Sequence, residues 1–149
     1  IYPNKKAINT LVERKTGLVQ FKKLERKTKE LTAQAMIENI KKYPNSKTLT
    51  VDNGTEFTDH ERITLETNVT VYFADPYSSW QRGSNENSNM LLRGYLPKKA
   101  NIDNLTEEEL ADIEFELNNR PRKRLNYLTP IEAYQLEKQN ILFSVAIAT

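Results

Sequence analysis

The sequence predicts a single α/β domain in which strands and helices alternate along the chain. Two kinds of segment support this prediction. Short segments with apolar residues at every second position predict strands, and longer segments with an apolar stripe at helical spacing predict helices. The two kinds alternate over most of the chain. A length of 149 residues, 38% of them hydrophobic and 28% charged, suits one domain that buries a substantial core.

The first third of the chain predicts a β-hairpin followed by a helix. Residues 7–13 and 18–24 are the two expected strands, joined by a turn in which Gly17 supplies backbone freedom. The helix is expected to begin after Thr28, a suitable N-cap, and to end at residues 43–45, which contain a proline. Its apolar residues follow the helical spacing closely: Ala33, Met36, Ile37 and Ile40.

The middle of the chain predicts the elements that would carry a site. Residues 48–51 form a short strand that delivers Asp52, and the Asn-Gly pair after it is a common turn signal. A short helix is expected over 59–67 and a strand over 69–74. A polar loop then leads to a helix over 85–96.

Two capping boxes mark the remaining helices. Thr106 and Glu109 have the required spacing, and so do Thr129 and Glu132, with a proline at the favoured first helical position of the second box. The sequence contains no internal repeat, no low-complexity tract and no composition shift that would divide it. We therefore expect one domain over residues 1–149.

The composition limits the possible chemistry. The absence of cysteine excludes disulfides, thiolate zinc sites and a cysteine nucleophile, and a single histidine, His60, excludes multi-histidine metal sites. Any metal must therefore bind oxygen ligands, which suits Mg²⁺ or Mn²⁺. No apolar stretch approaches the roughly 20 residues that span a bilayer, and residues 1–6 lack a signal-peptide pattern. We expect a cytoplasmic protein with no membrane partner.

The charge is unevenly distributed along the chain. Residues 1–51 carry 12 Lys and Arg residues against four Glu residues, whereas residues 52–149 carry 10 Lys and Arg residues against 16 acidic ones. Such an imbalance suits a polyanion-binding face beside an acidic metal site. A solvated, Lys-rich surface would produce the same imbalance.

Asp52 and Glu86 are the candidate catalytic residues and the candidate metal ligands. Asp52 is expected to project from the edge of the sheet, and Glu86 lies in the first turn of an expected helix. The 33 residues between them suffice for a helix, a strand and a loop, so the two carboxylates can converge. Two-metal phosphoryl transfer needs carboxylates on rigid elements, which hold ions about 4 Å apart. Each acid also has an ordinary explanation, as a turn residue or as a helix N-terminal acid.

Candidate nucleic-acid contacts surround Glu86. Asn89 and Arg93 share its helical face. The loop before it offers an aromatic ring, an amide and a cation that could stack on bases or contact phosphates: Trp80, Gln81 and Arg82. The densest basic run of the chain is either a phosphate-binding strip or a solvated helix exit, and contains Arg120, Arg122, Lys123 and Arg124.

Three motifs occur in a characteristic order. They are Val-Asp-Asn-Gly-Thr-Glu-Phe at 51–57, Pro-Tyr-Ser-Ser-Trp-Gln-Arg-Gly-Ser-Asn-Glu-Asn at 76–87, and Asn-Asn-Arg-Pro-Arg-Lys at 118–123 followed by Thr-Pro-Ile-Glu-Ala at 129–133. In this order and spacing, the chain closely resembles the catalytic core of bacterial insertion-sequence transposases of the DDE type, relatives of retroviral integrases. The resemblance covers nearly the whole chain.

The resemblance implies a fold, an activity and partners. The implied fold is ribonuclease-H-like, a mixed β-sheet flanked by helices. The implied activity is cleavage and transfer of DNA strands at the ends of a mobile element, with Mg²⁺ or Mn²⁺ at a two-metal site. The implied partners are DNA and further copies of the chain in a homo-oligomer, at the nucleoid of a bacterium.

One part of the resemblance is missing. The second acid of the Asp-Asp-Glu triad falls on Asp52 and the glutamate on Glu86, but residues 1–51 contain no Asp. Glu13 is no substitute, because it lies in what reads as the second strand of the fold. We expect the first, central strand and its aspartate to lie upstream of Ile1, so that this fragment alone is inactive.

Two other interpretations remain open at this point. Another nuclease of the same fold, such as a ribonuclease H or a resolvase, would lack the motifs at 80–83 and 119–122. A catalytically inactive nucleic-acid-binding or assembly module derived from a transposase would account for the missing aspartate. An aspartate in an upstream strand would remove the support for that module.

Overall fold

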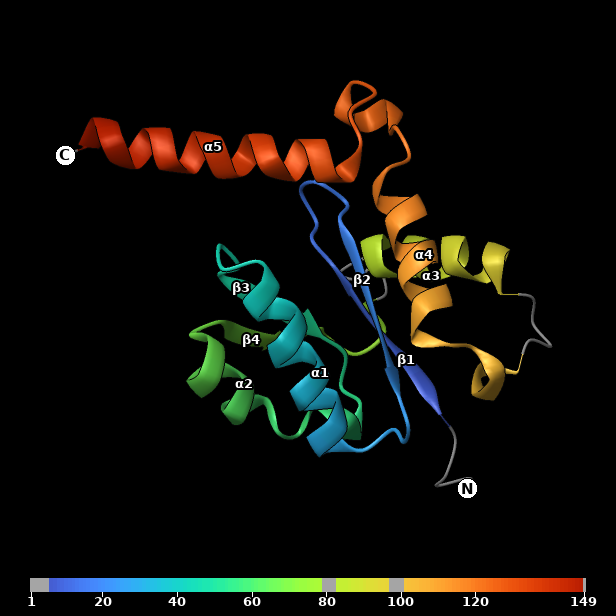
Figure 1. Cartoon of the computed structure of the whole chain (residues 1–149). Coiled ribbons are helices and arrows are strands. Elements are labelled where there is room, and N and C mark those ends of the chain that lie inside the picture. The colour runs from blue at the N-terminus through green and yellow to red at the C-terminus, as the bar shows by residue number, and fades with distance from the viewer. Residues whose placement is uncertain (1–5, 79–82, 97–100, 149) are drawn as a thin grey trace.

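The alternation of strands and helices predicted from the sequence is present in the structure. The computed structural model describes residues 6–78, 83–96 and 101–148, and for residues 83–86 and 140–148 it describes the backbone alone. Figure 1 shows a central β-hairpin with helices and two further strands on one side of it, helices on the other side, and a long C-terminal helix that runs away from both groups. In the described part of the chain, no helix has the length and apolar character needed to cross a membrane.

The hairpin is formed by the two strands predicted first. β1 (Ala7–Val12) and β2 (Val19–Leu24) pair in an antiparallel register. The turn between them is held by the carboxylate of Glu13, which accepts the backbone N–H of Thr16 at 2.7 Å. Gly17 has a φ of 73°, a conformation that favours glycine. Glu13 therefore belongs to the turn, and the first strand ends one residue earlier than predicted.

A second group of elements, the Asp52 half, lies on one side of the hairpin. It contains α1 (Lys29–Lys42), β3 (Thr48–Val51), the short 3₁₀ turn η1 (Thr55–Phe57), α2 (His60–Thr67) and β4 (Thr70–Phe73). β3 and β4 pair in parallel. The half encloses a core of buried apolar residues: Ala33, Met36, Ile37, Ile40, Leu49, Val51, Phe57, Ile63 and Val69.

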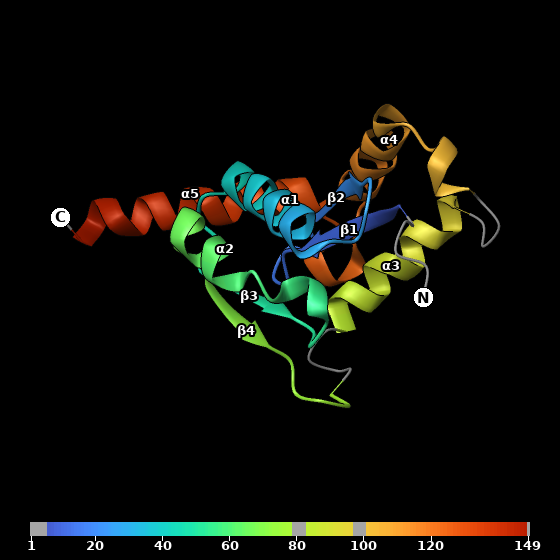
Figure 2. The ribbon, with the colours of Figure 1, turned by 90° about the horizontal axis from the view of Figure 1, so that it is seen from below.

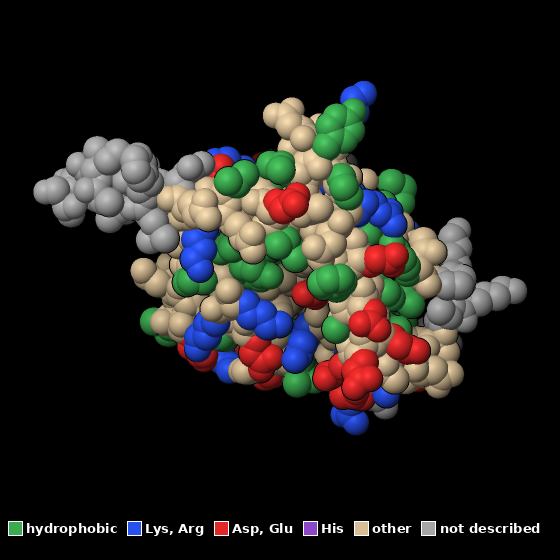
Figure 3. All heavy atoms as spheres, turned by 45° about the horizontal axis from the view of Figure 1, so that its top comes forward, with side chains coloured by type: hydrophobic (Ala, Val, Ile, Leu, Met, Phe, Trp, Pro, Cys, Tyr) green, Lys and Arg blue, Asp and Glu red, His purple; other side chains and the backbone are tan. Residues whose placement is uncertain are grey.

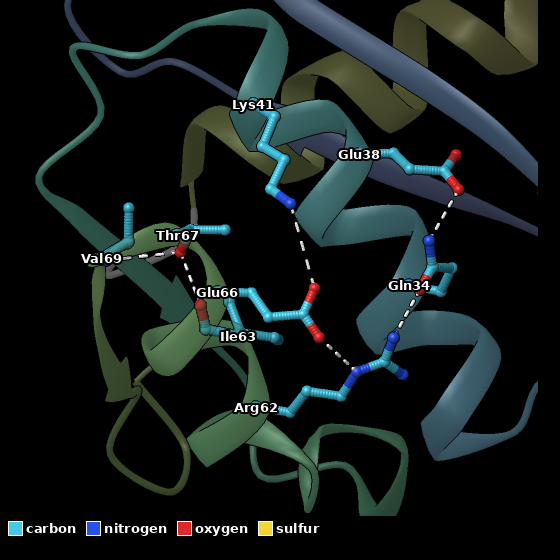
Figure 4. A network of polar contacts seen from close by, with 8 residues as sticks. All are labelled: Gln34, Glu38, Lys41, Arg62, Ile63, Glu66, Thr67 and Val69. Atoms are coloured by element: carbon cyan, nitrogen blue, oxygen red, sulfur yellow. Dashed lines mark hydrogen bonds and ion pairs between the residues drawn. The ribbon is translucent and has the colours of Figure 1, made fainter.

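Polar contacts on the surface connect α2 to α1 (Figure 4). Arg62 is central to them, because its Nε donates to Glu66 at 2.9 Å and its Nη2 donates to Gln34 at 2.5 Å. Lys41 Nζ lies 4.0 Å from the same Glu66 carboxylate. Exposed pairs of this kind contribute little stability, so the apolar contacts between the two helices are what hold α2 in place.

The hairpin half consists of β1 and β2 with the helices α3 (Gly83–Tyr95) and α4 (Glu107–Asn118). Figure 2 shows both helices on the side of the hairpin that faces away from α2 and β4. A short turn, η3 (Ile102–Asn104), precedes α4. The half has its own core of buried residues, namely Val19, Phe21, Leu92, Leu105, Leu110 and Leu117.

The helix starts predicted from capping patterns are confirmed. Thr28 caps α1 by accepting the N–H of Leu31. Thr106 and Glu109 form both hydrogen bonds of a capping box at α4. The residues at 129 and 132 form the same pair of bonds at the start of α5 (Pro130–Ala148), which follows the short turn η4 (Lys123–Leu125).

The two sheets are separate in the described part of the chain. β1 pairs only with β2, and β3 pairs only with β4. Between β1 and β3 lies a cavity of about 620 Å³, here called the inter-sheet slot, whose lining includes every residue of both strands. The edges of β1 and β3 that face this slot have no strand partner among the described residues. The helices flank the strands as expected, but these four strands do not form one continuous sheet.

Candidate active site

Asp52 directly follows the last residue of β3, as predicted, and its backbone is tied to the end of β4. The carbonyl of Val51 accepts the N–H of Ala74 at 2.8 Å, and Asn53 Nδ2 donates to the carbonyl of Ala74 at 2.8 Å. Asp52 Oδ1 accepts the N–H of Gly54 at 3.1 Å. These bonds fix a half-buried carboxylate at the C-terminal end of a parallel strand pair, the usual position for a site in an α/β fold.

Glu56 lies beside Asp52, a neighbour that the sequence analysis did not single out. A Cβ atom added at Gly54 would lie 2.5 Å from Glu56 Oε2 and 2.9 Å from Asp52 Oδ1, so both carboxylates approach this glycine closely. Lys27 Nζ forms an ion pair with Glu56 Oε1 at 2.6 Å. The spacing of four residues between the two acids, across a short turn, was the signal available in the sequence.

The helix that carries Glu86 is present, but its side chain lies outside what the structure describes. Asn89, one turn further along α3, lines the inter-sheet slot together with Asp52, so this helix reaches the same cavity. Arg93 is exposed in the last turn of α3. The loop residues predicted to touch DNA lie outside the described residues: Trp80, Gln81 and Arg82. Convergence of Asp52 and Glu86 therefore stays a prediction.

The predicted basic run lies against α3. Arg120 Nη2 donates to the hydroxyl oxygen of Tyr95 at 2.6 Å. Arg122 is half-buried, whereas Lys123 and Arg124 are exposed in η4. Burial lowers the pKa of Arg122, and the positive charges of Arg120 and Arg124 lower it further. The run is therefore a cluster of like charges beside the helix that bears position 86.

The outward face of α4 has the opposite charge. Figure 3 shows acidic side chains gathered at the lower right of the face that it presents. The exposed acids of α4 are Glu107, Glu108, Glu109, Asp112 and Glu116. A polyanion would be repelled by this surface, so a nucleic acid would approach the chain from another side.

The donor atoms present around Asp52 suit a hard divalent cation. Asp52 and Glu56 supply carboxylate oxygens, which Mg²⁺ and Mn²⁺ prefer, and Lys27 offsets only one of the two negative charges. The described residues contain no group of three or more His, Cys, Asp or Glu side chains placed to hold a metal. A complete site therefore needs a contribution beyond these side chains.

Two comparisons of the sequence point to the same class of protein. The chain is 43% identical to the transposase for insertion sequence element IS4351 of Bacteroides fragilis over 148 residues, 98% of this chain. It is 43% identical to the transposase InsI for insertion sequence element IS30A of Escherichia coli K12 over 127 residues, 84% of this chain. The chain spans only 44% and 33% of the lengths of these relatives. No protein-family model matches the sequence.

Solved structures establish the fold. The catalytic core domain of BIV integrase superposes with a TM-score of 0.70 at 24% identity and covers 95% of this chain and 99% of that one. A chain from the structure of the simian T-cell lymphotropic virus intasome in complex with the PP2A regulatory subunit B56 gamma superposes with a TM-score of 0.67 at 17% identity, over 89% of this chain and 54% of that one. The chain thus has the mixed α/β, ribonuclease-H-like fold of an integrase catalytic core, and its sequence is similar to segments of insertion-sequence transposases.

Proposed function

We propose that this chain is the catalytic core of a DNA transposase, which cleaves and transfers DNA strands at the ends of a mobile element in the bacterial cytoplasm. The observation that carries the proposal is the position of Asp52 at the end of β3, within the motif at 51–57, in a chain 43% identical to transposases over nearly all its length. The integrase-like fold supports it, because that fold brings α3 to the same cavity as Asp52.

Asp52 and Glu86 are the proposed metal ligands. Two Mg²⁺ or Mn²⁺ ions, when bound, would activate the attacking oxygen and stabilise the leaving one. The chain itself supplies orientation: the bonds of Asn53 and Gly54 hold the Asp52 carboxylate at the strand end. Lys27 forms an ion pair with Glu56, which positions a second carboxylate beside Asp52.

The third carboxylate of the site would come from a strand in the inter-sheet slot. Both strands that flank the slot have an open edge there, and Asp52 lies at one end of its lining. Asn9 Oδ1 and Thr32 Oγ1 are buried in its wall and have no hydrogen-bond partner within the described residues. Buried polar atoms nearly always have a partner, so a strand placed here would join the two sheets into one and satisfy such atoms. We expect a single domain without a strand in this slot to be inactive.

The proposed DNA contacts extend from the active site to the basic run. They comprise Trp80, Gln81, Arg82, Asn89, Arg93, Arg120, Arg122, Lys123 and Arg124. Two observations support this assignment: the basic run lies against α3, and the exposed acidic residues lie on α4. A homo-oligomer is proposed because the two ends of a mobile element must be joined to one target.

Replacing Asp52 tests the site directly. In the full-length protein, Asp52→Asn is expected to reduce Mn²⁺-dependent strand transfer to the assay background while leaving binding to element-end DNA unchanged, because the amide keeps the shape but loses the negative charge. Asp112→Asn, which removes an exposed charge from the outer face of α4, is the matched control and should keep wild-type activity. Wild-type strand transfer by the Asp52 variant would refute the assignment.

The alternative of an inactive, transposase-derived module rests on the absence of a three-carboxylate group among the described residues. The same experiment separates the two proposals. A full-length wild-type protein that binds element ends but shows no strand transfer with either Mg²⁺ or Mn²⁺ would favour the module.

A further inference from the structure

Three segments that are distant in the sequence meet at a notch outside the Asp52 site. The notch has a volume of about 230 Å³ and lies between the β1–β2 turn, the start of α3 and the segment after α4. We call it the arginine notch. Its lining consists of Val12, Arg14, Gly17, Asn87, Ser88, Leu91, Arg122 and Arg124.

The notch collects positive charge without an acidic side chain in its lining. Arg14, Arg122 and Arg124 form no ion pair with any carboxylate whose side chain the structure describes, whereas several lysines and Arg62 do. Burial and the neighbouring arginine charges lower the pKa of Arg122, which is the effect expected where cations crowd without compensation. An anion in the notch would relieve this repulsion.

Two of the three guanidinium groups are held in place by the backbone. Arg122 Nη2 donates to the carbonyl of Leu117 at 3.2 Å, and Arg124 Nη1 donates to the carbonyl of Lys15 at 3.1 Å. Each guanidinium has five N–H donors, so most of them stay available to a ligand. Gly17 leaves the room that Arg124 occupies, because a Cβ atom at Gly17 would collide with Arg124 Nη2. The donors are thus positioned before any ligand arrives, which lowers the entropy cost of binding.

We propose that the arginine notch binds one phosphate group of the DNA backbone and that Arg14 is a DNA-positioning residue. Arginine matches phosphate because its planar group donates two parallel hydrogen bonds. Asn87 lines the notch and directly follows position 86 in α3. The bound phosphate would therefore lie within about one helical turn of position 86. The inference rests on the proposed function and adds a residue from the hairpin turn to the DNA surface.

The salt dependence of DNA binding tests the notch. In the full-length protein, the slope of log K against log salt for a labelled 30-base-pair duplex is expected to fall by about one when the single phosphate contact is lost. Arg14→Gln and Arg124→Gln should each reduce affinity and slope, and the double variant should lose only about one unit of slope in total, because both residues hold the same phosphate. Arg14→Lys should retain most of the slope, since the charge remains.

Arg26→Gln is the matched control, because it removes an exposed arginine between β2 and α1, outside the notch. A slope for Arg14→Gln equal to that of the wild type, or an equal loss for Arg26→Gln, would overturn the proposal. Inorganic phosphate should compete with the duplex only at high concentration, and displacement at low millimolar phosphate would indicate a site for the free ion instead.

The test is independent of the test at Asp52. Duplex binding needs no catalysis, so the notch stands if its variants lose slope even when Asp52→Asn retains strand transfer. Conversely, Asp52→Asn could abolish strand transfer while the notch variants keep the wild-type slope. That result would support the proposed function and refute phosphate binding at the arginine notch.

Discussion

The Asp52 half and the hairpin half are each built around a two-stranded sheet, but they close the outer edge of that sheet differently. In the hairpin half, side chains of α4 bond the backbone of β2. In the Asp52 half, the outer strand β4 stays largely exposed, with Tyr72 at 55% and Phe73 at 41% exposure. In both halves the other edge faces the inter-sheet slot and has no strand partner in the part of the chain that the structure describes. The two halves therefore differ at their outer edges but are alike at the slot, which Asp52 also lines.

α1 is the element that the two halves share. Its buried face belongs to the core of the Asp52 half, yet it also reaches the hairpin: Gln20 Nε2 donates to the carbonyl of Asn39 at 3.0 Å, and Lys22 pairs with Glu38 at 3.3 Å. Because a two-stranded sheet is marginally stable by itself, we expect these contacts to make the halves unfold together.

The largest expected effects come from removing one core side chain in each half. Ile37→Ala in the Asp52 half and Leu117→Ala in the hairpin half should each destabilise the chain by about 2–5 kcal/mol, because both side chains are almost fully buried. Urea unfolding followed by circular dichroism should show one transition in both variants, and Leu65→Ala, at 86% exposure, should change it little. Two separate transitions would show that α1 does not couple the halves.

A smaller effect is expected where α4 closes the edge of β2. Asn118 is 3% exposed, and its side chain both accepts the N–H of Val19 and donates to the carbonyl of Val19, at 2.8 Å in each case. Asn118→Ala should lower the free energy of unfolding by about 2–4 kcal/mol, because the buried N–H and carbonyl of Val19 both lose their partner.

Urea unfolding measures this cost, and Asn119→Ala is the neighbouring control. Asn119 is exposed, and among the described residues its side chain has one hydrogen bond, to the carbonyl of Phe115 at the end of α4, which the backbone N–H of Asn119 also bonds. An equal loss of unfolding free energy in the two variants would mean that the hydrogen bonds of Asn118 to β2 do not stabilise the chain more than those of Asn119. Hydrogen exchange of the Val19 amide should accelerate in the Asn118 variant alone.

The smallest expected effect is a pH dependence at the same edge. Burial raises the pKa of the Glu114 carboxyl above its ordinary value of 4.5, although its hydrogen bond from the Phe21 N–H at 2.7 Å opposes the shift. The fold therefore favours the protonated form, and this contribution to stability is present below pH 4.5 and is lost as pH rises through the raised pKa. Glu114→Gln stays neutral throughout, so its stability relative to the wild type should increase as pH rises from 4.5. A constant difference across that range would contradict this explanation.

Helix starts and strand positions could be predicted because their signals are local. A capping threonine bonds N–H groups two or three residues away, and the alternation of apolar residues records which face of a strand is buried. The edge contact of Asn118 with Val19 could not be predicted, since it joins residues 99 positions apart in the chain. The same holds for the Lys27–Glu56 ion pair and for the place of Arg14 in the arginine notch, which depend on how separate segments pack.

Short-range patterns and ordered motifs were enough to predict the class of fold, the position of Asp52 at a strand end and the resemblance to transposase cores. Three features became visible only in the folded chain: the four described strands form two sheets around the inter-sheet slot, Glu56 lies beside Asp52, and three arginines from two distant segments converge. Burial, edge pairing and the crowding of charges depend on which segments pack together. Local sequence patterns do not show which distant segments become neighbours in space.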